Sequence, residues 1–171
     1  MGLFFDFLFM VVMISFGYGA LSGAPWVPSW GFDVQRAIRL ATIKHGDTFV
    51  DLGCGDGRLV AAAAREGAHA IGYEVALVPY AIAKLRQWFF RGAGSMDIRL
   101  ASFWNASLRD VDIVYIFLMK QHYPRLMEKL KTELKPGARV VTYVWPLPGW
   151  TIAKKEPVVH RQPPLFFYTI D

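Results

Sequence analysis

The chain has 171 residues, the size of one ordinary domain, and 54% of them are hydrophobic, enough for a buried core. Its net charge at pH 7 is +5. The single cysteine, Cys54, excludes an internal disulfide and suits a reducing compartment. The four histidines are scattered and match no metal-ligand spacing, so we expect no metal site.

An apolar segment opens the chain. From Leu3 to Leu21 the only ionisable residue is Asp6, and as a helix this segment would measure ~28 Å, close to the ~30 Å hydrocarbon core of a bilayer. We therefore predict a transmembrane anchor over residues 1–24 that contacts the lipid bilayer through residues 3–21. Because every basic residue lies on its C-terminal side, the positive-inside tendency predicts a single-pass membrane protein with a cytoplasmic catalytic domain. A cleaved signal peptide and a packed helix are the alternatives, although the segment lacks a basic start and is apolar around its whole circumference.

Residues 25–46 are predicted to hold a linker and a short helix. The stretch 22–31 contains glycines, prolines and the tryptophans Trp26 and Trp30, a composition typical of a shaped linker. These tryptophans could lie at a membrane interface or over a ligand pocket. From Phe32 to Thr42, apolar residues then repeat at helical spacing, which predicts a helix.

From residue 47 onward, strand-like and helical segments alternate. Such alternation is typical of an α/β domain with a mostly parallel sheet, and we predict one domain over residues 47–171. The last two strands have no helix between them, so we expect them to pair as an antiparallel hairpin. The expected strands are 48–52, 68–74, 97–101, 112–118, 138–145, 150–155 and 165–170, and the expected helices are 58–66, 76–91 and 123–134.

A glycine-rich loop follows the first of these strands. After Asp51 come three glycines at alternate positions, Gly53, Gly55 and Gly57, and Glu74 ends the second strand. Glycines let a backbone approach a ligand closely, and a carboxylate at the tip of the second strand can accept bonds from both ribose hydroxyls. Dinucleotide sites read G-x-G-x-x-G instead. The spacing therefore predicts a cofactor that contains adenosine but no pyrophosphate.

The same loop, Glu74 and the segment Leu134–Ala138 before the fifth strand together resemble the seven-stranded S-adenosylmethionine-dependent methyltransferases. The resemblance covers residue 47 to the C-terminus and implies a Rossmann-like sheet of seven strands with S-adenosyl-L-methionine as cofactor. More closely, the chain resembles the small membrane-anchored protein-lysine methyltransferases whose mitochondrial members modify the ATP synthase c-subunit and the adenine nucleotide translocase. The features behind this likeness are the apolar N-terminus, Val27-Pro28, Phe117-Leu118, Gln121, Pro124–Leu126 and Trp145–Trp150.

This resemblance implies roles for the cofactor-binding residues. The three glycines would face the methionine and ribose parts of the cofactor, Asp51 would orient the methionine ammonium, and Glu74 would accept hydrogen bonds from the ribose. Ser102 stands where the family often has an acid for the adenine amino group, so backbone groups and Phe103 would serve there. Pro28 is also among the residues that we predict to bind the cofactor.

The resemblance also implies that the methyl acceptor is a lysine in a membrane-associated protein. Four aromatic residues lie near the ends of expected strands, where we expect them to form a channel with Gln121 orienting the amine: Trp104, Phe117, Tyr123 and Trp145. The same aromatic residues could equally be ordinary core side chains. His122 is either a base or a surface residue at the start of a helix.

Two other functions fit the same residues. A methyltransferase for a small lipophilic molecule would use the same cofactor loop, and Ser102 would fit a catalytically inactive cofactor-binding module. We expect no nucleic-acid partner, because the basic residues are spread along the chain and no Asn-Pro-Pro-Tyr type motif follows the fourth strand.

Overall fold

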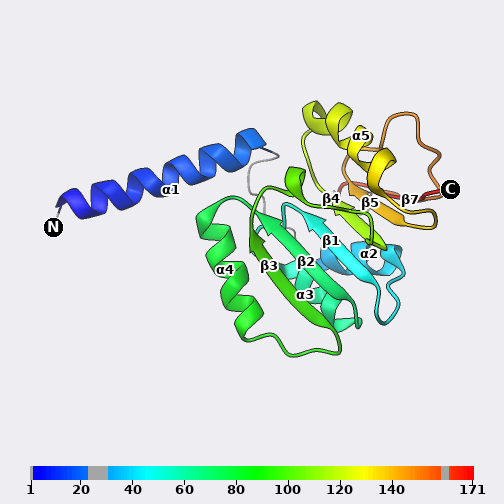
Figure 1. Ribbon diagram of the computed structural model, residues 1–171, viewed down its shortest axis with the longest axis horizontal. Helices are drawn as coiled ribbons and strands as arrows, with labels where there is room; N and C mark the ends of the chain where they lie inside the picture. The colour runs from blue at the N-terminus through cyan, green and yellow to red at the C-terminus, as the bar shows by residue number, and fades with distance from the viewer. Residues whose placement is uncertain (1, 23–30, 159–161) are drawn as a thin grey trace.

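The computed structural model describes residues 2–22, 31–158 and 162–171 and centres on one seven-stranded sheet (Figure 1). The strand order is β3-β2-β1-β4-β5-β7-β6. β1 to β5 run parallel, and β7 pairs antiparallel with both β5 and β6. The predicted sheet and its antiparallel C-terminal hairpin are therefore confirmed. The strands are β1 Thr48–Leu52, β2 His69–Glu74, β3 Ser95–Leu100, β4 Ile113–Ile116, β5 Arg139–Tyr143, β6 Lys154–Glu156 and β7 Leu165–Thr169.

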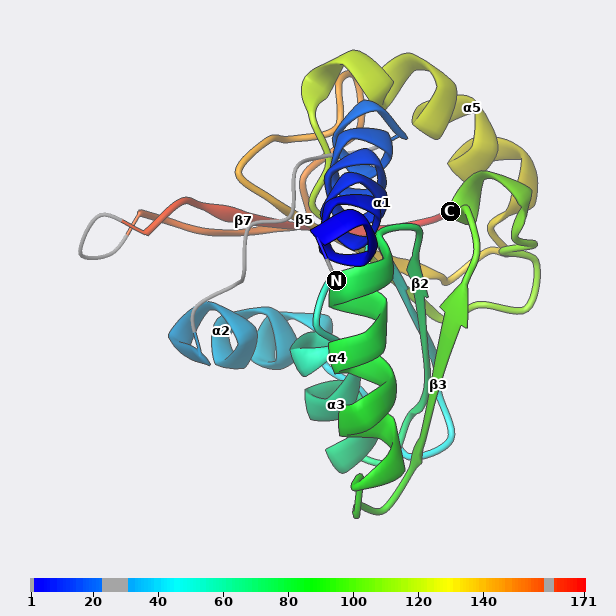
Figure 2. The same cartoon turned by 90° about the vertical axis from the view of Figure 1, so that its left-hand side faces the viewer.

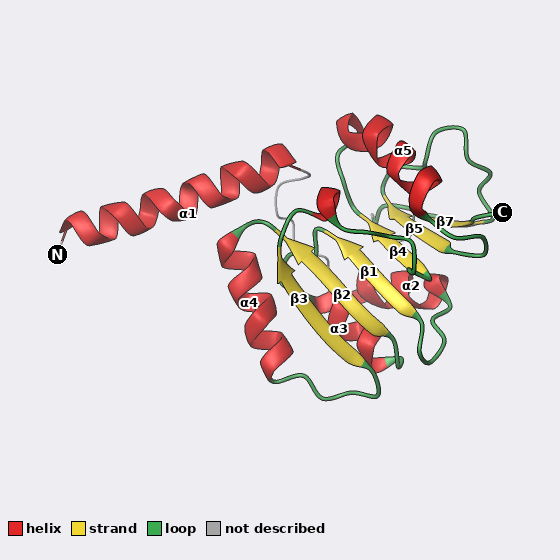
Figure 3. Cartoon of the chain, in the orientation of Figure 1, coloured by secondary structure: helices red, strands yellow, loops and turns green. Residues whose placement is uncertain are grey.

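Helices cover both faces of this sheet (Figure 3). One buried cluster joins the sheet to α2, α3 and α4, and a second joins its other face to α5. All four residues of β4 are buried, which explains its uninterrupted apolar sequence. The helices are α1 Gly2–Ser22, α2 Gly31–Ala41, α3 Arg58–Arg65, α4 Leu77–Trp88 and α5 Tyr123–Glu133, with short 3-10 turns η1 Phe103–Asn105 and η2 Lys120–His122.

The predicted fifth strand, 138–145, is too long at its C-terminal end. β5 stops at Tyr143 because Val144 adopts a positive φ of 75°. A β-branched residue rarely takes this left-handed conformation, which costs about 1–3 kcal/mol. The chain therefore turns out of the sheet just before Trp145.

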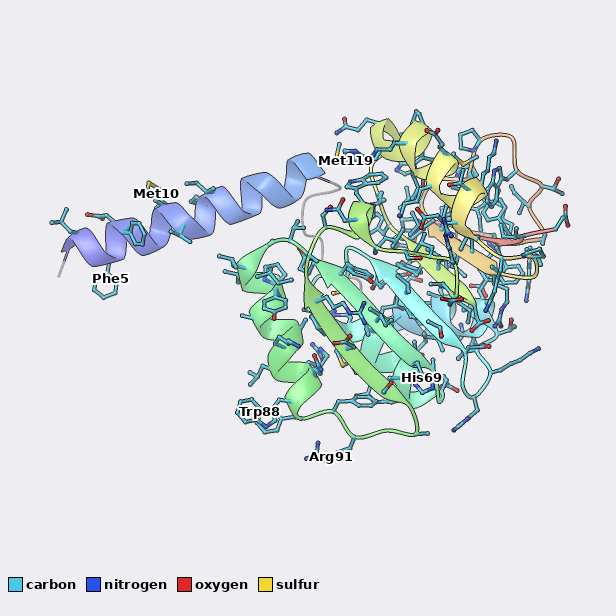
Figure 4. All side chains as sticks on the ribbon, in the orientation of Figure 1. Phe5, Met10, His69, Trp88, Arg91 and Met119 are labelled. Atoms are coloured by element: carbon cyan, nitrogen blue, oxygen red, sulfur yellow. The ribbon has the colours of Figure 1, made fainter. Side chains whose placement is uncertain are left out.

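The sheet has a switch point at its carboxyl edge. β1 lies between β2 and β4, and Leu52 stands in register with Tyr73 on one side and Ile116 on the other. At this point the strand order reverses direction, and the loops after neighbouring strands diverge to leave a crevice in which ligands bind in open α/β sheets. Met119, after β4, marks this edge in Figure 4, and His69, at the start of β2, lies at the opposite edge.

Helix α1 projects away from the sheet and contacts the body through α4 (Figures 1 and 2). Within the described residues, no helix has both the length and the apolar character needed to span a membrane. A bilayer crossing requires one long, continuously apolar helix, so the prediction of a single-pass membrane protein with a cytoplasmic catalytic domain is wrong. The predicted bilayer contact through residues 3–21 depended on that span, and the described residues give no support for it. Most of the predicted linker, residues 23–30, lies outside the described residues.

Candidate active site

The glycine loop leaves β1 and is pinned against β2. The backbone N–H groups of Gly53 and Cys54 donate to the carbonyl of Tyr73 at 3.1 and 2.9 Å. Gly53 has a φ of 103° and is exposed, and a Cβ added there would meet nothing within 4 Å. The loop therefore presents bare backbone to open space, as a cradle for a ligand requires.

Gly57 has a different surrounding. It is buried with a φ of 74°, and a Cβ added there would stand 3.0 Å from the side chains of Ala83 and Met96. Its position allows α3 to begin in close contact with α4 and β3. Gly57 thus serves the packing that holds the loop.

Glu74 ends β2 and ties the loop to that strand. One carboxylate oxygen accepts the N–H of Gly55 at 2.8 Å, and the other accepts those of Val75 and Ala76 at 2.9 and 2.8 Å. Only 8% of the residue is exposed. Glu74 therefore fixes the shape of the glycine loop, and the oxygen that accepts from Gly55 retains one lone pair for a further donor.

Asp51 is the second carboxylate at this edge, with 4% of its surface exposed. Burial raises its pKa to about 8, and the nearby charges of Glu74 and Asp56 add to this effect. Asp51 is consequently protonated for the most part at neutral pH. A cation placed beside it would reverse this, because an opposite charge favours the ionised carboxylate.

The prediction overlooked Asp56, which lies inside the loop. Its carboxylate binds Arg58 at 2.6 Å and Arg86, from α4, at 3.2 Å. Burial raises the pKa of Asp56, but the hydrogen bonds and charge of Arg58, with the charge of Arg86, bring it below the ordinary value. Arg86 also donates to the backbone oxygen of Asp56 at 2.9 Å, so α4 holds the loop from outside. No local pattern signals this pair, because the two residues are 30 positions apart.

Cys54 packs between this loop and β2. A Cβ on Gly72 would come within 2.7 Å of its sulfur, so the bare backbone of β2 makes room for the thiol. Burial raises the pKa of Cys54 well above its ordinary value, with Asp51 and Glu74 adding to the effect. The thiol therefore stays protonated at neutral pH, and the thiol is a much weaker nucleophile than the thiolate.

The remaining residues predicted to bind the cofactor lie after β3. The hydroxyl of Ser102 accepts the N–H of Trp104 at 3.4 Å and so caps the turn η1. Phe103 is buried in the core beneath α5, with its ring centroid 4.5 Å from that of Trp104. Both residues thus follow the carboxyl end of β3, where Ser102 caps a turn and Phe103 packs in the core. Pro28 lies outside the described residues.

Two of the predicted acceptor residues meet at the end of β5. The hydroxyl of Tyr123 and that of Thr142 both donate to the carbonyl of Trp145, at 3.1 and 2.8 Å. Burial raises the pKa of Tyr123, with Tyr168 adding to the effect, so its hydroxyl remains a donor at neutral pH. The backbone of Trp145 is therefore fixed, while the residue stays 38% exposed.

The other two predicted acceptor residues lie on the α5 side of the edge. The Trp104 ring centroid is 6.3 Å from that of His122, and the Arg125 guanidinium lies 4.3 Å above the Trp104 ring. Gln121 is exposed, with its amide nitrogen 3.3 Å from Nε2 of His122. Lys129 of α5 donates to the carbonyl of Trp104 at 3.4 Å, which holds this group against the helix.

Lys120 is a residue that the prediction missed. Its ammonium lies 4.1 Å from the centroid of the Trp145 ring.

Across the described ranges, no group of three or more His, Cys, Asp and Glu residues is placed to hold a metal ion.

The fold and the placement of the site define a Rossmann-like methyltransferase class. The protein superposes on an RNA methyltransferase from Salinibacter ruber in complex with S-adenosyl-L-homocysteine, with a TM-score of 0.77 and 27% sequence identity. The superposition covers 84% of this chain and 94% of that structure.

Residues 51–154 match the family model of the ANTKMT methyltransferase domain, and the chain belongs to this family. It is 37% identical over 129 residues to the mouse ATP synthase c-subunit lysine N-methyltransferase, and the match covers 74% of this chain but 51% of the mouse protein. It is also 32% identical over 130 residues to a protein-lysine N-methyltransferase of Saccharolobus islandicus, of which it covers 80%. The chain thus spans about half the length of its mouse relative and most of its archaeal relative.

Proposed function

We propose that this protein is an S-adenosyl-L-methionine-dependent methyltransferase that N-methylates lysine in a protein substrate. One observation carries the proposal: the buried carboxylates of Asp51 and Glu74 flank an open glycine loop at the switch point of the sheet. The family and the names of the mouse and archaeal relatives support lysine as the acceptor. We place the cofactor-binding domain at residues 47–171.

The residues present suit such a cofactor. Gly53 offers room for it, the Glu74 oxygen that accepts from Gly55 has a free lone pair for a ribose hydroxyl, and Asp51 is a buried partner for the methionine ammonium. Ser102 and Phe103 would border the adenine at the end of β3. When bound, S-adenosyl-L-methionine supplies an activated methyl group on a sulfonium.

The protein's own contribution to methyl transfer is placement and control of a proton. A lysine amine must be neutral to act as the nucleophile, and with a pKa of ~10.4 its deprotonation at pH 7 costs about 4–5 kcal/mol. Aromatic walls lower this cost because burial favours the neutral amine. Trp104, Tyr123 and Trp145 would form these walls, with Gln121 as the exposed amide that orients the amine. His122 lies beside Gln121 and is a candidate acceptor of the proton.

The substrate we favour is a membrane-associated protein. The relatives are named for the c-subunit of the ATP synthase and, in a mouse relative 37% identical over 127 residues, for the adenine nucleotide translocase. We therefore propose a protein of this type as the acceptor for this chain.

Radiolabelled cofactor distinguishes the possible acceptors. The full chain is incubated with membrane and RNA fractions, which are then separated into protein, RNA and organic phases. We expect label in a protein band that yields methyl-lysine on hydrolysis and that is absent when the enzyme is omitted. Label in the organic phase would support a lipophilic acceptor, label in RNA would support a likeness to the Salinibacter protein in function, and no label would refute the proposal.

Glu74→Ala tests the site itself. Loss of the carboxylate removes the ribose acceptor, the hydrogen bond to Gly55 of the loop and the two to Val75 and Ala76 after β2, so we expect cofactor affinity to fall at least tenfold, equivalent to about 1.4 kcal/mol. Isothermal calorimetry measures the affinity, and circular dichroism checks the fold. The matched control is Glu66→Ala, an exposed acid at the end of α3. Equal affinity in both variants would contradict the assignment.

A further inference from the structure

A lysine of the chain itself occupies the face of an aromatic residue at the acceptor edge. The ammonium of Lys120 lies 4.1 Å from the centroid of the Trp145 ring, within the range of a cation–π interaction. In the described part of the chain, no carboxylate lies within ion-pair distance of Lys120. Both side chains are exposed, so the contact with the ring can open into water.

The backbone that carries the Trp145 ring is held in place. Two hydroxyls, of Tyr123 and Thr142, donate to its carbonyl, and the preceding Val144 is kept in a left-handed conformation. The N–H of Val144 donates to the carbonyl of Pro164 at 2.9 Å, which adds a further restraint on the turn. A strained, well-anchored turn that leaves an indole exposed is a feature found at binding sites.

Topology places this pair beside the cofactor loop. Lys120 follows β4 and Trp145 follows β5, and β4 lies between β1 and β5 in the sheet. Ile116, at the end of β4, is in register with Leu52, directly before Gly53, and with Thr142. The loop after β4 therefore lies between the glycine loop and the Trp145 turn, where a methyl acceptor must enter.

We propose that the face of the Trp145 ring is an entry subsite for the ammonium of an acceptor lysine, before that amine loses its proton for methyl transfer, and that Lys120 is an internal ligand that occupies it until the acceptor displaces it. The ligand class rests on the proposed function; the cation site itself rests on the contact between Lys120 and Trp145. Lys120 is then a competitor that weakens the binding of every acceptor lysine to the same degree.

Fluorine NMR on the full chain tests this proposal without any cofactor. The six tryptophans are labelled with 5-fluorotryptophan, and the Trp145 resonance is identified by its loss in Trp145→Phe. The probes are Nα-acetyl-lysine amide, whose charge is the side-chain ammonium, and the uncharged Nα-acetyl-norleucine amide. The variants are Lys120→Met, which keeps a long, flexible side chain without the charge, and the control Lys131→Met, an exposed lysine of α5.

In the absence of any probe, we expect Lys120→Met to shift the Trp145 resonance. We also expect this variant to bind the lysine probe about two- to fivefold more tightly than the wild type, the range given by an exposed cation–π contact of ~0.5–1 kcal/mol. The other five resonances report an intact fold. Equal affinities in Lys120→Met, Lys131→Met and the wild type, or equal binding of the norleucine probe, would overturn the inference.

The outcome is separable from that of the proposed function. Lysine methylation by the same protein without a response of Trp145 to the probe would refute the cation site alone. A response of Trp145 as expected, with no methyl-lysine formed on any protein, would refute the proposed activity and leave the cation site standing.

Discussion

Asp51 and Glu74 carry the same functional group in different surroundings. Glu74 accepts three backbone N–H groups and thereby fixes the glycine loop, whereas Asp51 is buried beside two other carboxylates, and burial first of all raises its pKa to about 8. The first residue shapes the site, and the second makes it responsive to a cation. Both lie within the loop and strand ends that the sequence pattern singled out.

The raised pKa of Asp51 predicts that cofactor affinity depends on pH. Under the proposed function the methionine ammonium pairs with the ionised carboxylate of Asp51, and in the free protein that form becomes more abundant as pH rises toward about 8. Between pH 5.5 and 7.5, where the ligand amine is still largely cationic, we expect affinity for S-adenosyl-L-homocysteine to rise by nearly tenfold per pH unit. Calorimetric titration over this range measures the slope.

Asp51→Asn is the matching variant. We expect weaker binding and a flat profile, because the amide has no charge to gain. Asp97→Asn, a half-exposed acid on β3, is the control and should keep the slope of the wild type. A slope that survives in Asp51→Asn would assign the titration to another group.

Single elements are shaped by strain and by long side chains. α2 ends where Thr42 takes a φ of 48°, a left-handed conformation that glycine adopts freely at helix ends. On the other face, Lys129 and Glu133 of α5 bind the carbonyl of Ala106 and the N–H of Leu108, which fixes the segment that carries Trp104. Element ends and loop positions therefore depend on contacts that helix and strand periodicity does not encode.

Thr42→Gly should stabilise the protein. The left-handed conformation costs a β-branched residue about 1–2 kcal/mol, and part of the gain is lost to the greater freedom of glycine in the unfolded chain, so we expect a net rise of ~0.5–1 kcal/mol in the free energy of unfolding. Urea denaturation measures it. Gln35→Gly, an exposed position inside α2, should lower stability by ~1 kcal/mol, and a loss of stability in both variants would contradict this explanation.

Across the whole molecule, one buried arginine joins the two ends of the domain. Arg36 of α2 is 2% exposed and binds Asp33 and Glu156, each at 3.1 Å, as well as the carbonyls of Pro157 and Pro163. Tyr143 of β5 donates to the same Asp33 at 3.0 Å. The network holds α2 to the C-terminal hairpin.

Arg36→Met should destabilise the fold strongly. Removing the guanidinium leaves the buried Asp33 without its cation, and breaking a buried pair in this way costs about 3–5 kcal/mol. Chemical denaturation measures the loss. Arg39→Met, an exposed arginine on the same helix, should change stability by less than ~0.5 kcal/mol. Similar values for the two variants would show that the network contributes little.

A strand that depends on neighbouring residues in the sequence was predicted correctly, whereas a strand end that depends on contacts between distant residues was not. β1 was predicted with its observed ends, Thr48 and Leu52, because an apolar run followed by a glycine loop defines a buried strand locally. The fifth strand was predicted too long, because the turn at Val144 depends on a hydrogen bond to Pro164. The transmembrane anchor was predicted from the length and apolar character of residues 3–21 and from the basic residues that follow, and the described helices do not support it.

The sequence by itself determined the sheet, its hairpin and the glycine loop with Glu74, because periodicity and glycine spacing act between near neighbours. Only the tertiary structure decided which side chains from different elements meet: Arg86 with Asp56, Arg36 with Glu156, and Lys120 with Trp145. These pairs join separate elements, and their partners are chosen by how the helices and loops pack on the sheet. Burial also set the pKa of Asp51, since desolvation exists only once the core has formed.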